Sequence, residues 1–82
     1  MADQAWARPC FNMACACALL GSTDTAIGYL RLALERDALM VLPWIRSDSD
    51  LDAVRSSGAY RVLEKEYAMD QLIAENARFL YD

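Results

Sequence analysis

The sequence contains no histidine and no run of basic residues. Histidine is the commonest general base near neutral pH and a frequent zinc ligand, so its absence removes the usual centre of acid–base and metal chemistry. Eight Lys and Arg residues against twelve Asp and Glu residues give a net charge of -4, which argues against nucleic-acid binding. We therefore expect neither an enzyme nor a nucleic-acid-binding protein.

The sequence also lacks any apolar stretch of ~18 uninterrupted residues, the length that a membrane-spanning helix needs. It has no basic amphipathic face for a membrane surface, so we expect no direct membrane insertion. Apolar residues nevertheless make up 56% of the chain, above the ~45–50% usual in soluble proteins. Because a domain of 82 residues has a small core, part of this apolar surface is expected to meet a partner, unless alanine alone accounts for the high fraction.

Cysteine is present only as Cys10, Cys15 and Cys17. An odd number of cysteines clustered in one predicted helix is not a disulfide framework. We therefore expect a reducing compartment, the cytoplasm or an organelle interior. The spacing matches no common zinc or iron–sulfur pattern. We predict no metal and no cofactor, with Cys15 buried and inert as a small apolar side chain. A redox- or metal-responsive cysteine protein is the minor alternative.

Glycine and proline are scarce, at three and two residues, and they separate apolar segments that have helical spacing. We predict one small all-α domain over residues 1–82. Its first helix begins near Pro9 and ends at Gly21, because proline suits a first turn and glycine a helix end. Trp6 precedes this helix and is expected to pack back on the bundle. The expected inward stripe consists of Met13, Ala14, Cys17 and Leu20.

A second helix is predicted from the capping residues 22–24 to Asp37, and it completes an antiparallel hairpin over residues 9–37. Gly28 lowers helix propensity, so we expect close backbone contact there. The inner stripe of the second helix consists of Ala26, Ile27, Leu30, Ala33 and Leu34.

After this helix, residues 38–49 are predicted to form an apolar connection, irregular or partly helical, with Trp44 buried as its anchor.

Residues 50–67 are predicted to form two closing helices. The first is short, from Asp50 to about Ser56, with Leu51 and Val54 facing inward. The aspartates in this region also suggest a calcium loop. That hypothesis fails, because alanine stands at both the glycine and the glutamate positions of such a loop, Ala53 and Ala59.

The last helix is predicted from about Ala59 to Leu80, with residues 68–82 as a helical extension. Its early apolar face faces the hairpin, and its late face lies almost opposite. Either the helix bends near Asp70 or its second half packs on something else, a partner or a second copy of the chain. The early face consists of Tyr60, Leu63 and Tyr67. The late face consists of Met69, Leu72, Ile73, Phe79 and Leu80.

Residues 9–37 resemble a tetratricopeptide repeat, the helix–turn–helix unit of solenoid scaffolds. The motif Asn-Met-Ala-Cys at residues 12–15 is similar to the Asn-Leu-Ala-Cys motif that is common in the last repeat of bacterial and organellar tetratricopeptide-repeat arrays. Such a repeat is followed by an Asp-x-Asp-Leu-x-x-Leu-Arg segment and a closing helix, which residues 48–55 and 59–67 resemble. Cys17 departs from the family, which usually has an aromatic residue there. The matching positions in the hairpin are Ala14, Gly21, Ala26, Leu30 and Ala33.

The resemblance implies a scaffold that binds other protein subunits. A single repeat does not form the peptide groove of long arrays, which needs ~3 or more repeats. The resemblance nevertheless places Asn12 where such repeats often hold the backbone of a bound peptide, and Arg8 lies one turn earlier in the same helix. We therefore predict partner binding through the late face of the last helix, with Asn12 and Arg8 as further contacts. The alternative is a homo-oligomeric adaptor whose last helices pair with each other.

Overall fold

The computed structural model describes the backbone of residues 2–67 and the side chains of residues 6–67. This part of the chain is all-α, as the sequence predicts, and contains no strand. None of its helices is both long and apolar enough to cross a membrane. The elements are α1 (Ala2–Leu19), α2 (Thr23–Ser47), the 3-10 helix η1 (Ser49–Leu51), α3 (Asp52–Arg55) and a helix over residues 58–67.

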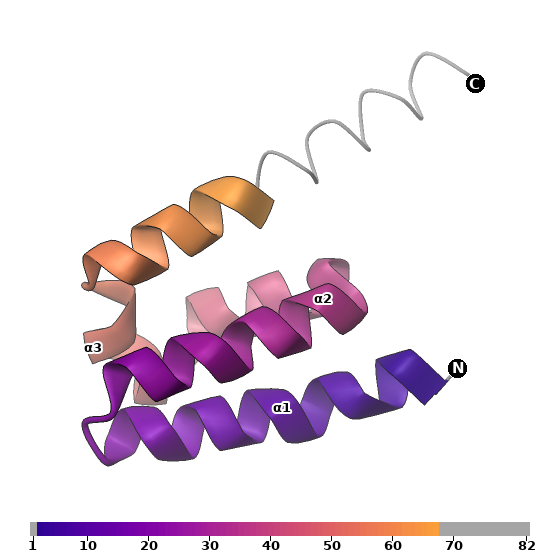
Figure 1. The fold of residues 1–82 in the computed structure, drawn as a ribbon, viewed down its shortest axis with the longest axis horizontal. Coiled ribbons are helices and arrows are strands. Elements are labelled where there is room, and N and C mark those ends of the chain that lie inside the picture. Colours follow the sequence, from indigo (N-terminus) through magenta and orange to yellow (C-terminus); the bar gives the residue numbers. More distant parts are fainter. Residues whose placement is uncertain (1, 68–82) are drawn as a thin grey trace.

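The helices form an antiparallel arrangement around α2 (Figure 1). α1 lies beside the first half of α2, and the second half of α2 turns back behind them. The helix over residues 58–67 runs along α2 on the side away from α1. Ion pairs tie it to both halves of α2, from Arg31 to Glu66 at 3.2 Å and from Arg46 to Glu64 at 2.9 Å.

The turn between α1 and α2 is closed by Gly21, which has φ +80°. The Ser22 N–H donates to the Cys17 carbonyl at 2.9 Å, and the Gly21 N–H donates to the Ala18 carbonyl at 3.0 Å. This pair of bonds satisfies the last carbonyls of α1 and requires a left-handed residue at the glycine position. The prediction that Gly21 ends the first helix is confirmed.

The predicted start of this helix is wrong, because α1 begins at Ala2 and Pro9 lies inside it. An interior proline removes one backbone hydrogen bond and costs ~3 kcal/mol. The preceding residues are mostly alanine, glutamine and arginine, which are strong helix formers. Burial of Ala7, which is 1% exposed, further offsets this cost. Trp6 does not pack back on the bundle and is 59% exposed.

The inward stripe of α1 is rotated from the predicted one. Ala14 is buried as expected and Cys17 is half-buried, but Met13 and Leu20 are exposed. Almost every residue from Pro9 to Leu20 is apolar, so periodicity alone does not select one face. The deciding residue is Phe11, 2% exposed, because an aromatic ring gains most from burial. The buried stripe is Ala7, Phe11, Ala14 and Cys15.

The inner stripe of α2 matches the prediction, with Ile27 partly buried and the other four residues fully buried. The expected close contact at Gly28 is absent among the described residues, because a Cβ there would meet no atom within 4 Å. The helix breaks where expected, at Asp37, whose φ of -161° and ψ of 82° are non-helical. The Asp37 Oδ1 accepts from the Met40 N–H at 3.2 Å and so caps the second half of α2.

The connection over residues 38–49 is therefore helical as far as Ser47. Pro43 lies inside it and Trp44 is only half-buried, so the prediction of Trp44 as a buried anchor is wrong. The anchors are three smaller aliphatic side chains whose spacing places them on one helix face. They are Val41, Leu42 and Ile45.

The chain after α2 closes one end of the hairpin. The Asp48 side chain accepts from the Asp50 N–H at 3.0 Å and starts η1. Leu51 and Val54 are fully buried as predicted. The early face of the last helix also packs inward, with Tyr60 and Leu63 buried and Tyr67 partly buried. The predicted late face lies outside the described residues.

Candidate protein-binding site

The two exposed polar residues predicted for partner binding lie on α1 but have different surroundings. Arg8 and Asn12 are both exposed and one helical turn apart. The structure brings Arg8 to a hollow between α1 and the second half of α2. Asn12 is not among the residues that line this hollow. The other predicted contacts, Met69 to Leu80, lie outside the described residues.

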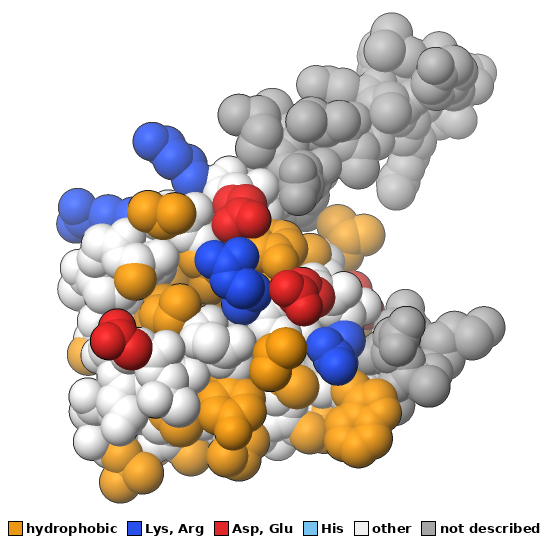
Figure 2. Space-filling model, viewed as in Figure 1, with side chains coloured by type: hydrophobic (Ala, Val, Ile, Leu, Met, Phe, Trp, Pro, Cys, Tyr) orange, Lys and Arg blue, Asp and Glu red, His pale blue; other side chains and the backbone are white. Residues whose placement is uncertain are grey.

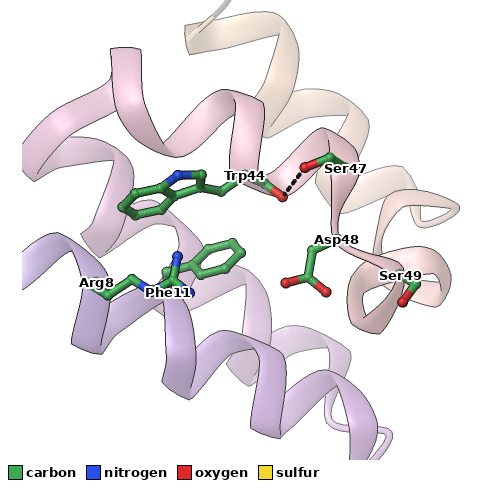
Figure 3. Close-up of a pocket in the computed structure, with 6 residues that line it drawn as sticks. All are labelled: Arg8, Phe11, Trp44, Ser47, Asp48 and Ser49. Atoms are coloured by element: carbon green, nitrogen blue, oxygen red, sulfur yellow. Dashed lines mark hydrogen bonds between the residues drawn. The ribbon is translucent and has the colours of Figure 1, made fainter.

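Arg8 lies against two aromatic rings (Figure 3). Its guanidinium carbon is 4.8 Å from the ring centroid of Trp44 and 5.5 Å from that of Phe11. The two ring centroids are 5.5 Å apart with planes tilted by 56°. Arg8 and Phe11 are neighbours on α1 because of their three-residue spacing, and Trp44 comes from the second half of α2. A cation this close to ring faces is attracted by their quadrupoles.

The hollow continues from the rings to the polar end of α2 (Figure 3). It has a volume of about 370 Å³ and is bounded by Ser47, Asp48 and Ser49 beyond the rings. The Ser47 hydroxyl donates to the Pro43 carbonyl at 2.9 Å and lies 3.5 Å from the Trp44 carbonyl. Asp48 and Ser49 thus place a carboxylate and a hydroxyl across the hollow from the guanidinium.

Trp44 also lines a second, more apolar hollow of about 400 Å³. Its walls include Leu39 and Met40, which are 58% and 52% exposed. Trp44 lines both hollows, so they form one surface, which we call the Trp44 surface. It consists of Ala7, Arg8, Phe11, Asp37, Leu39, Met40, Trp44, Ser47, Asp48 and Ser49.

Cys15 lies beneath the polar end of this surface. Its Sγ donates to Asp48 Oδ2 at 3.7 Å, and Asp50 completes a group whose ligand atoms lie within 4.8 Å of one another. Burial raises the pKa of Cys15 to about 11, and the negative charge and hydrogen bond of Asp48 add to this shift. The thiol is therefore protonated at neutral pH, and a protonated thiol is a poor nucleophile. Its burial, predicted from the sequence, is confirmed.

Most of the Trp44 surface was not predicted from the sequence. The three-residue spacing of Arg8 and Phe11 is a usable signal, because it puts a cation and a ring on one helix face. The contribution of Trp44 was hidden by the expectation that it is buried. The pairing of α1 with Ser47 and Asp48 depends on the reversal of α2 at Asp37, which brings distant segments together.

Comparison with known proteins identifies no relative of this chain. No family model matches the chain, and neither curated proteins nor solved structures give a significant match. The resemblance to a tetratricopeptide repeat therefore stays a prediction from residues 9–67.

Proposed function

We propose that this protein is a non-enzymatic protein–protein interaction module, a small scaffold or accessory subunit of a larger assembly. In this proposal the Trp44 surface binds a segment of another protein. The observation that carries it is the exposure of Leu39 and Met40 next to a stacked Arg8–Trp44 pair, at the rim of two open hollows. Tryptophan, arginine and methionine are enriched at protein interfaces, and tryptophan and arginine dominate their binding energy.

The two hollows favour different parts of a bound segment. The hollow beside Leu39 and Met40 is suited to an apolar side chain. The hollow beside Arg8 and Ser49 offers donors to a carbonyl or carboxylate. Since the rings already hold the guanidinium, less side-chain entropy is lost when a partner binds.

The chemistry of the surface supports binding rather than catalysis. Its ionisable groups are one guanidinium and the carboxylates of Asp37 and Asp48, and the nearby Cys15 thiol is protonated at neutral pH. A nucleophilic mechanism needs an activated nucleophile with an adjacent base. The resemblance of residues 9–67 to a terminal tetratricopeptide repeat favours the same function, because such repeats serve as scaffolds.

The test is affinity capture followed by reconstitution. Full-length protein and a Trp44→Ala variant are used to capture proteins from the cells that produce this chain, and each captured protein is then purified and titrated against both. We expect a partner whose affinity falls by about tenfold or more in the variant, as for an interface hot spot.

Val62→Ala is the matched control. Val62 is 65% exposed on the helix over residues 58–67, away from the Trp44 surface, so this variant should bind like the unmodified protein. Equal affinity of the Trp44→Ala variant and the unmodified protein for every reconstituted partner would refute the proposed site.

A further inference from the structure

A second apolar surface covers α1 and the first half of α2, away from the Trp44 surface. Arg8 and Cys15 face the second half of α2, where they contact Trp44 and Asp48. The opposite flank of α1 carries exposed Trp6, Met13 and Leu20. Figure 2 shows hydrophobic side chains gathered over the lower part of the molecule, where α1 and the adjoining half of α2 lie in Figure 1.

Between Trp6 and Leu20 this flank of α1 contains no charged side chain, and Asp3 extends the same stripe at its N-terminal end. Helical spacing places six of the described residues along the flank, and none of them is polar. They are Trp6, Pro9, Cys10, Met13, Cys17 and Leu20.

The adjoining face of the first half of α2 contains a hollow. Thr25, Gly28, Tyr29 and Leu32 line an open cavity of about 370 Å³. Gly28 costs ~1 kcal/mol relative to alanine in a helix, and no described neighbour requires its lack of a side chain. Leu32 is 40% exposed at the edge of this hollow.

We propose that this face, Trp6, Met13 and Leu20 with the hollow at Gly28, binds a second copy of the chain and forms a reversible two-fold dimer. A two-fold contact requires one face to carry both a protrusion and its complement, because residue i meets j while j meets i. Here exposed apolar side chains project from α1, and the hollow lies on the neighbouring half of α2.

The charge pattern favours self-association over a different partner. Each copy carries a net charge of -4, so two copies repel at long range, but the flank of α1 between Trp6 and Leu20 meets itself without like charges. A different partner is usually selected and oriented by complementary charges, which this flank of α1 lacks between Trp6 and Leu20. Added salt should therefore strengthen the dimer, because it screens the repulsion between like-charged chains.

The size of the face sets the strength of the contact. α1 has 18 residues and is about 27 Å long at 1.5 Å per residue. With α2 beside it, the face is on the order of 500 Å² per protomer, using a ~10 Å helix spacing. A total of roughly 1,000 Å² is at the lower limit for a specific interface, which predicts a dimer that dissociates on dilution.

The test is sedimentation equilibrium of the full chain over a concentration series, with two variants of the face and one control. Met13→Glu and Gly28→Glu each place a charge in the contact, and we expect each to weaken dimerisation by about tenfold or more. Leu19→Glu makes the same charge change at a residue of α1 that is 67% exposed and outside the face. The control should dimerise like the unmodified chain apart from the small effect of its extra charge, and circular dichroism should show equal helix content in all four proteins.

A second readout locates the contact. Cys17 is half-buried on the same flank of α1, so its labelling by a thiol reagent should slow as the protein concentration rises. A chain that is monomeric at all concentrations would overturn the proposal. So would a dimer that survives both face variants but is lost in the Leu72→Asp/Ile73→Asp variant, because that result assigns the contact to residues 68–82.

Discussion

Arg8 is held at the surface by aromatic rings and forms no ion pair with any described residue. Such a contact contributes about 0.5–1 kcal/mol at an exposed site. Its larger effect is positional, since it fixes a long flexible side chain in one place.

The packing of the core depends on smaller residues. Ala14, Ala26 and Ala33 are fully buried, which allows the backbones of α1 and α2 to approach closely.

The Ala26→Leu variant should be less stable by ~1–3 kcal/mol, because three extra carbons do not fit between α1 and α2 without displacing backbone or side chains. Urea denaturation followed by circular dichroism measures the change. Ala16→Leu adds the same atoms at an exposed position of α1 and should change stability little. Equal stability of the two variants would contradict the observed register of the hairpin.

Ionisation of Cys15 should make stability depend on pH. The pKa of Cys15 is raised from 9.0 to about 11 in the folded chain. Between these values the unfolded chain loses the proton first, so stability is full below pH 9 and falls as pH rises toward 11. Unfolding measured at several pH values should show this fall, and Cys15→Ala should reduce it.

Part of the alkaline fall should persist in the Cys15→Ala variant. Burial raises the pKa of Tyr60 from 10.0 to about 12, with the charge of Glu64 contributing. Tyr60 therefore adds its own loss of stability between pH 10 and 12. If stability falls between pH 9 and 10 as steeply in Cys15→Ala as in the unmodified protein, the burial of the thiol is contradicted.

At the scale of elements, α2 is two helices joined at Asp37. The break reverses the chain, so that one element contributes both a wall of the hairpin and half of the Trp44 surface. The aspartate side chain caps the second half through the Met40 N–H. That half is short and contains Pro43, so its start depends strongly on this cap.

The Asp37→Ala variant should lose ~0.5–2 kcal/mol of stability, the usual effect of removing an N-cap. Chemical denaturation gives this value. Asp24→Ala serves as the control, since Asp24 is exposed in the first turn of α2 and its side chain forms no hydrogen bond to another described residue. A loss in the control as large as in Asp37→Ala would mean that general charge effects, rather than the cap, are responsible.

The sequence predicted those features that local chemistry determines. Gly21 adopts a conformation that other residues rarely accept, and the stripe of α2 alternates clearly with polar residues such as Arg31 and Glu35. The register of α1 was missed because apolar residues cover nearly all of its surface. The Trp44 surface was missed because it depends on the meeting of α1 with residues 44–49, which no local pattern specifies.

At the scale of the whole molecule, the described chain carries two surfaces on different sides. The Trp44 surface lies between α1 and the second half of α2, and the proposed dimer face lies on α1 and the first half of α2. The helix over residues 58–67 occupies a third side. It is held by buried Tyr60 and Leu63 and by two exposed ion pairs, each of which contributes only ~0–1 kcal/mol.

The predicted contact of residues 68–82 is tested separately. In the Leu72→Asp/Ile73→Asp variant we expect loss of assembly with partner proteins while the hairpin stays folded, because two buried charges disfavour an apolar interface. Size-exclusion chromatography with a reconstituted partner measures assembly, and circular dichroism measures folding. A variant that assembles normally would refute the prediction, and one that unfolds would place this face in the core.

The position of Trp44 also gives the protein an optical reporter of its own. The emission of an indole ring responds to its solvent exposure and to the charges beside it, and Trp44 is half-buried against a guanidinium. Since the sequence contains two tryptophans, a chain with Trp6→Phe would fluoresce from Trp44 alone when it is excited at a wavelength that indole absorbs and tyrosine does not. Any molecule that displaces Arg8 or covers the indole would then shift the emission spectrum, so binding could be followed in solution without a dye or a tag.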